Sequence, residues 1–232
     1  MNHEKALKIV PENDKLFKSG AGEGMKSRFI EDFQPMPLKR TEKFVLSENI
    51  RKQTTIECIL ENRGKRVLAL NFANAHYPGG GYRNGALAQE ESLCRASMLY
   101  YTICNVKEFY ENNFKDGTAF YTDGMILSEK VPIIRDDNGD LLEFPMKADF
   151  LTSPAVNRNN IRESSNKHAD EVMKRRIEKI VSFMQSQHPD VIVLGAYGCG
   201  AFKNKREVIL PFFEEAVNKY TDGSAEIIFA IP

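Results

Sequence analysis

Carboxylates and glycines gather in one short segment of the chain. Gly79, Gly80 and Gly81 are followed, seven residues later, by Gln89-Glu90-Glu91. Glutamates can hold sugar hydroxyls or transfer protons, and glycines let backbone N–H groups approach an anion without a Cβ in the way. A second glycine-rich segment, residues 195–201, lies far along the chain. Together the two segments indicate a ligand that carries both a sugar and a phosphate.

Each feature also has a purely structural explanation. Acidic residues favour the first turn of a helix, and glycines favour tight turns. Two glycine loops shift the balance toward a phosphate-bearing ligand, and carboxylates beside an anion site then need another task. Adjacent helical residues point about 100° apart, so Glu90 and Glu91 do not easily flank one bond as paired glycosidase carboxylates do. One carboxylate for proton transfer, with its neighbour holding the sugar, fits better.

The elements that must position these residues follow from apolar periodicity. Strands are predicted at 43–46, 66–73, 119–127, 131–135, 149–153, 191–194 and 225–231. Helices are predicted at 48–60, with Ser47 as its cap, and at 89–105, 168–187 and 205–220. Strands alternating with helices predict a three-layer α/β domain with a mixed sheet over residues 41–232. Residues 1–40 are expected to form a partly mobile N-terminal arm with one short helix.

The strands at 66–73 and 191–194 are almost wholly apolar, as central strands buried on both faces should be. Each is followed by one of the glycine loops. Because ligands bind beyond the carboxyl ends of strands in open α/β sheets, both loops are expected at the same sheet edge. Neither loop fits the dinucleotide-binding or P-loop pattern.

Composition excludes several classes of protein. Lys plus Arg equals Asp plus Glu at 32 each, so bulk charge does not suggest binding to nucleic acid. The 4 cysteines form no CxxC pair and have no histidine at zinc-ligand spacing. We therefore expect no disulfide and no structural metal. Without an apolar run long enough for a bilayer, we expect no membrane contact and a cytoplasmic location.

Longer stretches around these motifs resemble poly(ADP-ribose) glycohydrolases of the bacterial and microbial branch. The resemblance covers roughly residues 50–232 and includes the three glycines, seven residues and Gln-Glu-Glu in that order. The other matching segments are 70–75, 85–95 with Ser97, 121–123, 131–132, 152–157 and 194–202.

The resemblance implies a macrodomain fold and hydrolysis of the ribose–ribose bond of ADP-ribose polymers, with ADP-ribose as product, and it implies no metal or cofactor. Glu91 matches the catalytic acid, and Glu90 matches the residue that holds ribose hydroxyls. The residues implied in substrate binding are Asn74, Gly79, Gly80, Gly81, Gln89, Gly198, Cys199, Gly200, Ala201 and Phe202. Phe202 matches an aromatic that packs on the terminal ADP-ribose, although a place in the core would also suit it.

Four residues depart from or qualify this resemblance. His76 and Tyr77 precede Pro78 where other side chains are usual, and Lys203 occupies a position where glycine is common. Cys199 suits either a redox-sensitive thiol or a small packing residue. Two other functions remain open: removal of single ADP-ribose units from protein or nucleic acid, and binding of ADP-ribose without catalysis. The Gln-Glu-Glu triplet argues against the latter.

Overall fold

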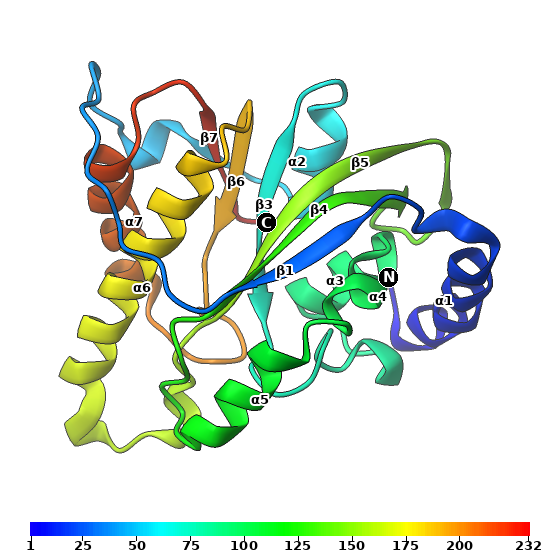
Figure 1. Ribbon diagram of the computed structural model, residues 1–232, viewed down its shortest axis with the longest axis horizontal. Helices are drawn as coiled ribbons and strands as arrows, with labels where there is room; N and C mark the ends of the chain where they lie inside the picture. Colours follow the sequence, from blue (N-terminus) through cyan, green and yellow to red (C-terminus); the bar gives the residue numbers. More distant parts are fainter.

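The computed structural model describes residues 1–232, and its centre is a seven-stranded sheet with the order β1-β4-β5-β3-β6-β7-β2 (Figure 1). The strands are β1 (Lys26–Ile30), β2 (Ile50–Arg51), β3 (Val67–Ala73), β4 (Met125–Arg135), β5 (Leu141–Pro154), β6 (Val191–Gly195) and β7 (Glu226–Ala230). β4 pairs antiparallel with β1 and β5, whereas all pairs from β5 to β2 are parallel. The sheet is therefore mixed, as predicted.

Helices cover both faces of this sheet. They are α1 (His3–Leu16), α2 (Thr55–Glu61), α3 (Gln89–Ala96), α4 (Leu99–Ile103), α5 (Lys107–Asp116), α6 (Asn166–Ser186) and α7 (Arg206–Tyr220). α6 and α7 lie on one face, and the remaining helices lie on the other (Figure 1). The predicted three-layer α/β architecture is confirmed.

The two apolar layers follow from the alternation of side chains along the central strands. In β3, Leu68 and Leu70 join the core under α6 and α7, whereas Val67 and Ala69 join the core under α2 and α3. Because both faces are covered, β3 and β6 need apolar residues at nearly every position. These two strands were predicted almost to the residue for that reason.

The structure differs from the prediction at the strand expected at 43–46 and at the helix expected at 48–60. Residues 43–46 form no strand, because Asn218 of α7 bonds both main-chain groups of Phe44, at 2.8 Å to N and 3.0 Å to O. The next helix begins at Thr55 instead of 48. Thr54 caps it through a reciprocal capping box with Glu57, which fixes the start more firmly than Ser47 would.

Two further boundaries were also wrong. The helix predicted at 89–105 is divided into α3 and α4, because Ser97 is extended and bridges to Ile133 of β4. The strands predicted at 119–127 and 131–135 are one strand, β4, which begins only at Met125. A register shift between Ser128 and Val131 interrupts its pairing with β5 and explains the break in the apolar pattern.

Residues 1–40 contain more regular structure than an arm with one short helix. α1 has 14 residues, and β1 pairs with β4 at the edge of the main sheet. Polar contacts anchor this segment. Asn13 is fully buried, accepts a hydrogen bond from Arg135 at 2.9 Å and donates one to the carbonyl of Arg95 at 2.9 Å. A search for apolar periodicity does not detect contacts of this kind.

Candidate active site

A cavity of about 510 Å³ opens at the carboxyl ends of β3 and β6. β6 pairs with β3 only from Val67 to Ala69, and beyond that point the two strands no longer bond to each other. Ligand pockets in proteins typically have volumes of about 300–1,000 Å³. The divergence of two parallel strands thus provides room for a nucleotide-sized ligand where such sheets bind ligands.

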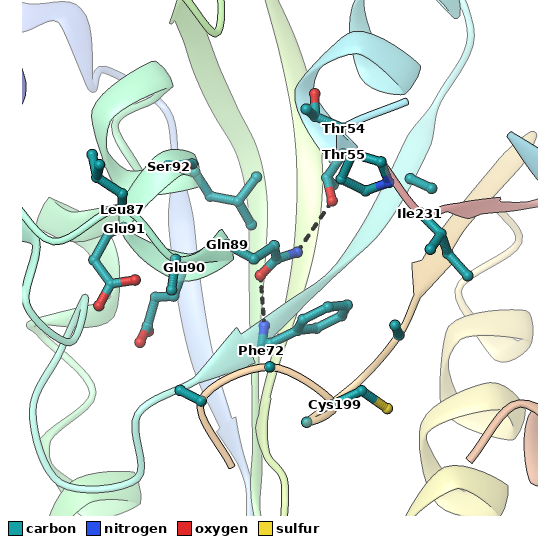
Figure 2. A pocket seen from close by; sticks show the side chains of 18 of the residues that line it. Thr54, Thr55, Phe72, Leu87, Gln89, Glu90, Glu91, Ser92, Cys199 and Ile231 are labelled. Carbon is teal, nitrogen blue, oxygen red and sulfur yellow. Dashed lines mark hydrogen bonds between the residues drawn. The ribbon is translucent and has the colours of Figure 1, made fainter. Parts of the chain in front are cut away.

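Gln89, the first residue of α3, joins that helix to the open side of β3. Its Oε1 accepts a hydrogen bond from the N–H of Phe72 at 2.9 Å (Figure 2). Its Nε2 donates to the carbonyl of Leu70 at 2.8 Å. Nε2 also lies 3.2 Å from the hydroxyl of Thr55 in α2. All these partners are protein groups, so Gln89 lines the cavity chiefly as a structural bridge.

Glu90 lies at one end of the cavity and is 3% exposed. Its Oε2 accepts from the N–H of Asn74 at 2.7 Å, and its Oε1 accepts from Nδ2 of Asn71 at 3.2 Å. Burial raises the pKa of Glu90 to about 8, the charge of Glu91 adds to the rise, and the hydrogen bonds from Asn74 and Asn71 oppose it. The rise favours the protonated form, in which this carboxyl can donate as well as accept a hydrogen bond.

Glu91 lies beside Glu90 and against the first glycine loop (Figure 2). Its Oε1 accepts the N–H of Gly81 at 2.9 Å. Gly80 has φ of +55°, and a Cβ at this position would lie 2.5 Å from Oε1 of Glu91 and 3.2 Å from Oε2 of Glu90. Only glycine leaves space here for both carboxylates. The first loop therefore holds the acidic pair in place.

The second glycine loop, residues 195–202, differs from the first loop in the hydrogen bonding of its backbone N–H groups. The N–H groups of Gly198, Gly200, Ala201 and Phe202 make no hydrogen bond within the protein. Nδ2 of Asn204 holds the loop by donating to the carbonyls of Val156 at 2.9 Å and Gly198 at 3.1 Å. Unpaired backbone N–H groups ahead of a helix N-terminus, here that of α7, form a site suited to an anion.

Most residues singled out from the sequence meet in this cavity. Its lining includes Asn74, Gln89, Glu90, Glu91, Gly198, Cys199, Gly200, Ala201 and Phe202. Gly79, Gly80 and Gly81 lie behind the carboxylates instead, and the N–H groups of Gly80 and Gly81 already donate to Tyr77 and Glu91. Direct substrate contact by these three glycines stays a prediction.

Sequence patterns missed the opposite end of the cavity. Thr54, Thr55, Phe72, Ile231, Pro232 and Asp137 also line it. Thr54 carries a usable signal, since Thr followed three residues later by Glu marks a helix start. Asp137 comes from the turn between β4 and β5, and only the fold brings it against Thr54. The terminal residues Ile231 and Pro232 likewise carry no motif.

Cys199 is half-buried, and burial raises the pKa of its thiol to about 11. Little of it is thiolate at neutral pH, which favours the interpretation as a packing residue. No group of three or more His, Cys, Asp or Glu side chains is arranged to hold a metal ion. None of the helices combines the length and apolar character needed to cross a membrane.

Comparisons with known proteins agree with this geometry. Residues 7–136 match the family model for the catalytic domain of microbial-type PARG. The poly(ADP-ribose) glycohydrolase (PARG) of Thermomonospora curvata, solved with the inhibitor ADP-HPD, is 30% identical with a TM-score of 0.81, covering 99% of this chain and 94% of that one. The Deinococcus radiodurans enzyme, solved with ADP-ribose, is 33% identical with a TM-score of 0.74 over 78% and 75% of the two chains. Comparison with curated proteins gives no match.

The mixed sheet, the two helical layers and the crevice with its acidic pair define an α/β protein of macrodomain-like architecture. The family match covers more than half of the chain. The chain therefore belongs to the microbial-type poly(ADP-ribose) glycohydrolase family.

Proposed function

We propose that this protein hydrolyses poly(ADP-ribose) at the ribose–ribose O-glycosidic bond of the polymer end and releases ADP-ribose. The observation that carries the proposal is the arrangement of the crevice. An acidic pair lies at one end, and a loop with several unpaired N–H groups forms part of its wall. This arrangement suits a sugar–diphosphate ligand whose reacting carbon lies at the acidic end.

In this proposal the diphosphate of the terminal unit binds the N–H groups of the second glycine loop, with Arg206 nearby in the cavity wall. The terminal ribose lies between Asn74, Glu90 and Phe202. Oδ1 of Asn74 already accepts the N–H groups of His76 and Tyr77, both at 2.9 Å, so its Nδ2 is the group available to the sugar. The cavity end at Phe72 and Ile231 is left for the base.

Glu91 acts as general acid and then as general base in the proposed reaction. It protonates the 2′ oxygen that leaves, while the terminal ribose becomes an oxocarbenium ion stabilised by the nearby diphosphate. Glu91 then removes a proton from the attacking water, so that it ends in its starting state. Glu90, in its protonated form, donates a hydrogen bond to a ribose hydroxyl and orients the sugar.

The test is incubation with defined poly- and mono-ADP-ribosylated substrates and identification of the products. ADP-ribose should accumulate from the polymer. Release from mono-ADP-ribosylated protein alone would replace this proposal by the second hydrolase function, and binding without any release would replace it by a binding function. As a separate check, free ADP-ribose at a hundredfold excess over Kd should stabilise the protein by about 2.7 kcal/mol, seen as a higher Tm.

A further inference from the structure

Four aromatic side chains form a connected cluster beside the first glycine loop. We call His76, Tyr77, Phe114 and Tyr121 the aromatic platform. The ring of His76 stacks on Phe114 with centroids 4.3 Å apart, and Tyr121 meets it edge-on at 5.4 Å. Tyr77 packs edge-on against Phe114 at 5.9 Å. The Nε2 atom of His76 has no hydrogen-bond partner, so ring packing sets the position of the imidazole.

The platform presents apolar rings to solvent. Tyr77 is 62% exposed and Phe114 is 52% exposed, and they come from different elements, the loop after β3 and the helix α5. Burying either ring in the core would stabilise the fold by about 1.5–3 kcal/mol, so two exposed rings in mutual contact are more informative than a single one. Stability of the domain does not explain their position.

Two contacts connect the platform to residues around the active-site cavity. The ring centroid of Tyr121 lies 6.2 Å from that of Phe202, which lines the cavity. In the second contact, the carbonyl of Tyr77 accepts the N–H of Gly80 at 2.9 Å, and Gly80 lies directly against the carboxylate of Glu91. The platform therefore adjoins the cavity wall at Phe202, and the backbone of Tyr77 is bonded to the glycine that lies against Glu91.

Tyr121 is held in this position at a cost. Its φ is +60°, a conformation that is strained for an aromatic residue. The fully buried Arg176 holds this segment, because its Nη2 donates to the carbonyls of Phe120 at 2.8 Å and Tyr121 at 3.1 Å. Strained backbone of this kind is retained where the surrounding structure enforces it, often near functional sites.

The chemistry of the substrate says what should lie here. The leaving 2′ oxygen belongs to the adenosine ribose of the second ADP-ribose unit, and adenine is attached to the neighbouring carbon of that ribose. When the bond lies at Glu91, this adenine must be within about one sugar ring of the carboxylate. Exposed aromatic rings bind bases by stacking, which contributes about 1–3 kcal/mol per base in alanine-substitution measurements.

We propose that the aromatic platform binds the adenine of the second, leaving ADP-ribose unit, and so makes this enzyme favour a polymer over a substrate without a base at that position. The inference rests on the proposed hydrolase function. It assigns a place in binding to His76 and Tyr77 and leaves proton transfer to Glu91.

The test compares two substrates in the full-length protein. One is poly(ADP-ribose), and the other is ADP-ribose joined at C1″ to the 2′ oxygen of a ribose that lacks a base. In the double variant Tyr77→Ala, Phe114→Ala, KM for the polymer should rise about 5- to 150-fold, which is the stacking free energy expressed as a ratio. The base-free substrate and the affinity for ADP-ribose should be unchanged. Tyr77→Phe should retain the wild-type KM.

Phe144→Ala is the matched control, because Phe144 is 68% exposed and does not line the cavity. It should leave both substrates unaffected. If the wild-type protein cleaves neither substrate, the proposed function itself fails. If the wild type cleaves both substrates, two results would contradict the proposal. One is a double variant with the wild-type KM for the polymer, and the other is an equal rise in KM for both substrates. Equal Tm values for the variants and the wild type would confirm that folding is unchanged. If the double variant unfolds, the same KM comparison is made with Tyr77→Ala alone.

Discussion

The two glycine loops of this protein look alike in sequence but differ in the use of their N–H groups. In the first loop, Gly80 and Gly81 donate to Tyr77 and Glu91. In the second, Gly198, Gly200, Ala201 and Phe202 donate to no protein group. The first loop is therefore occupied with positioning an acid, and the second is available to a ligand. Glycine content alone does not distinguish a loop that positions a carboxylate from a loop whose N–H groups are free to bind an anion.

The largest expected effect tests the acid held by the first loop. Glu91→Gln keeps the shape of the side chain but removes the proton that it transfers, so turnover of poly(ADP-ribose) should fall by about 10²–10⁴-fold. Affinity for ADP-ribose should change little, because in the proposed arrangement the second loop supplies the anion contacts. Steady-state kinetics and titration calorimetry measure the two quantities. Wild-type turnover in this variant would remove Glu91 from the mechanism and make His76 the next residue to test.

A second prediction concerns the pH dependence that Glu90 gives to folding. Its pKa rises from 4.5 to about 8 on folding, so between these values the folded protein retains a proton that the unfolded chain loses. The free energy of unfolding should therefore decrease as pH rises through this window, by about 5 kcal/mol at most, since one unit corresponds to about 1.4 kcal/mol. Urea unfolding at pH 5 and pH 9 measures it.

The matched variant is Glu90→Gln, which cannot titrate. Its stability should depend less on pH than that of the wild type, and the difference between them should favour the variant at pH 9. Its activity should nevertheless fall, with weaker substrate binding, because the sugar loses its orienting group. Parallel pH profiles for the two proteins would show that Glu90 keeps an ordinary pKa in the folded state.

The smallest effects come from alanine at one glycine of each loop. Gly80→Ala forces a Cβ against Glu91 at a positive φ, so stability should fall by roughly 1–3 kcal/mol and turnover should fall with it. Gly200→Ala meets no atom within 4 Å and should change stability by less than about 1 kcal/mol. It should instead weaken ADP-ribose binding, because its Cβ projects from the ligand-binding loop. The same loss of turnover in both variants, with ADP-ribose affinity intact, would contradict the division between the loops.

Sequence patterns correctly predicted the elements whose structure depends on residues nearby in the chain. β3, β6, α6 and α7 follow from apolar periodicity, and the sites of both loops follow from glycine after a buried strand. They failed where a distant group decides the outcome. Asn218 replaces a strand partner at Phe44, Ser97 breaks a helix by bridging to β4, and the amide of Asn13 anchors the N-terminal segment.

The same limit applies to the site. The acidic pair and the second loop were found because their residue types are unusual beside one another in the chain. The distal wall of the cavity comes from three separate segments, which include Thr54, Asp137 and Ile231. No short stretch of sequence contains them together. Their role depends on the path of the chain in space, which local spacing does not encode.

Gln89 has a consequence for the solubility of this fold. β5 pairs with β3 as far as Ala73, so the bonds of Gln89 to Leu70 and Phe72 lie on the side where β6 has parted from β3. A side-chain amide offers the same donor and acceptor as a peptide group, and here it occupies the place of one residue of a missing strand. Unpaired strand edges recruit other chains and promote aggregation. The sheet of this enzyme thus opens wide enough for a nucleotide without leaving an unpaired strand edge inside the opening.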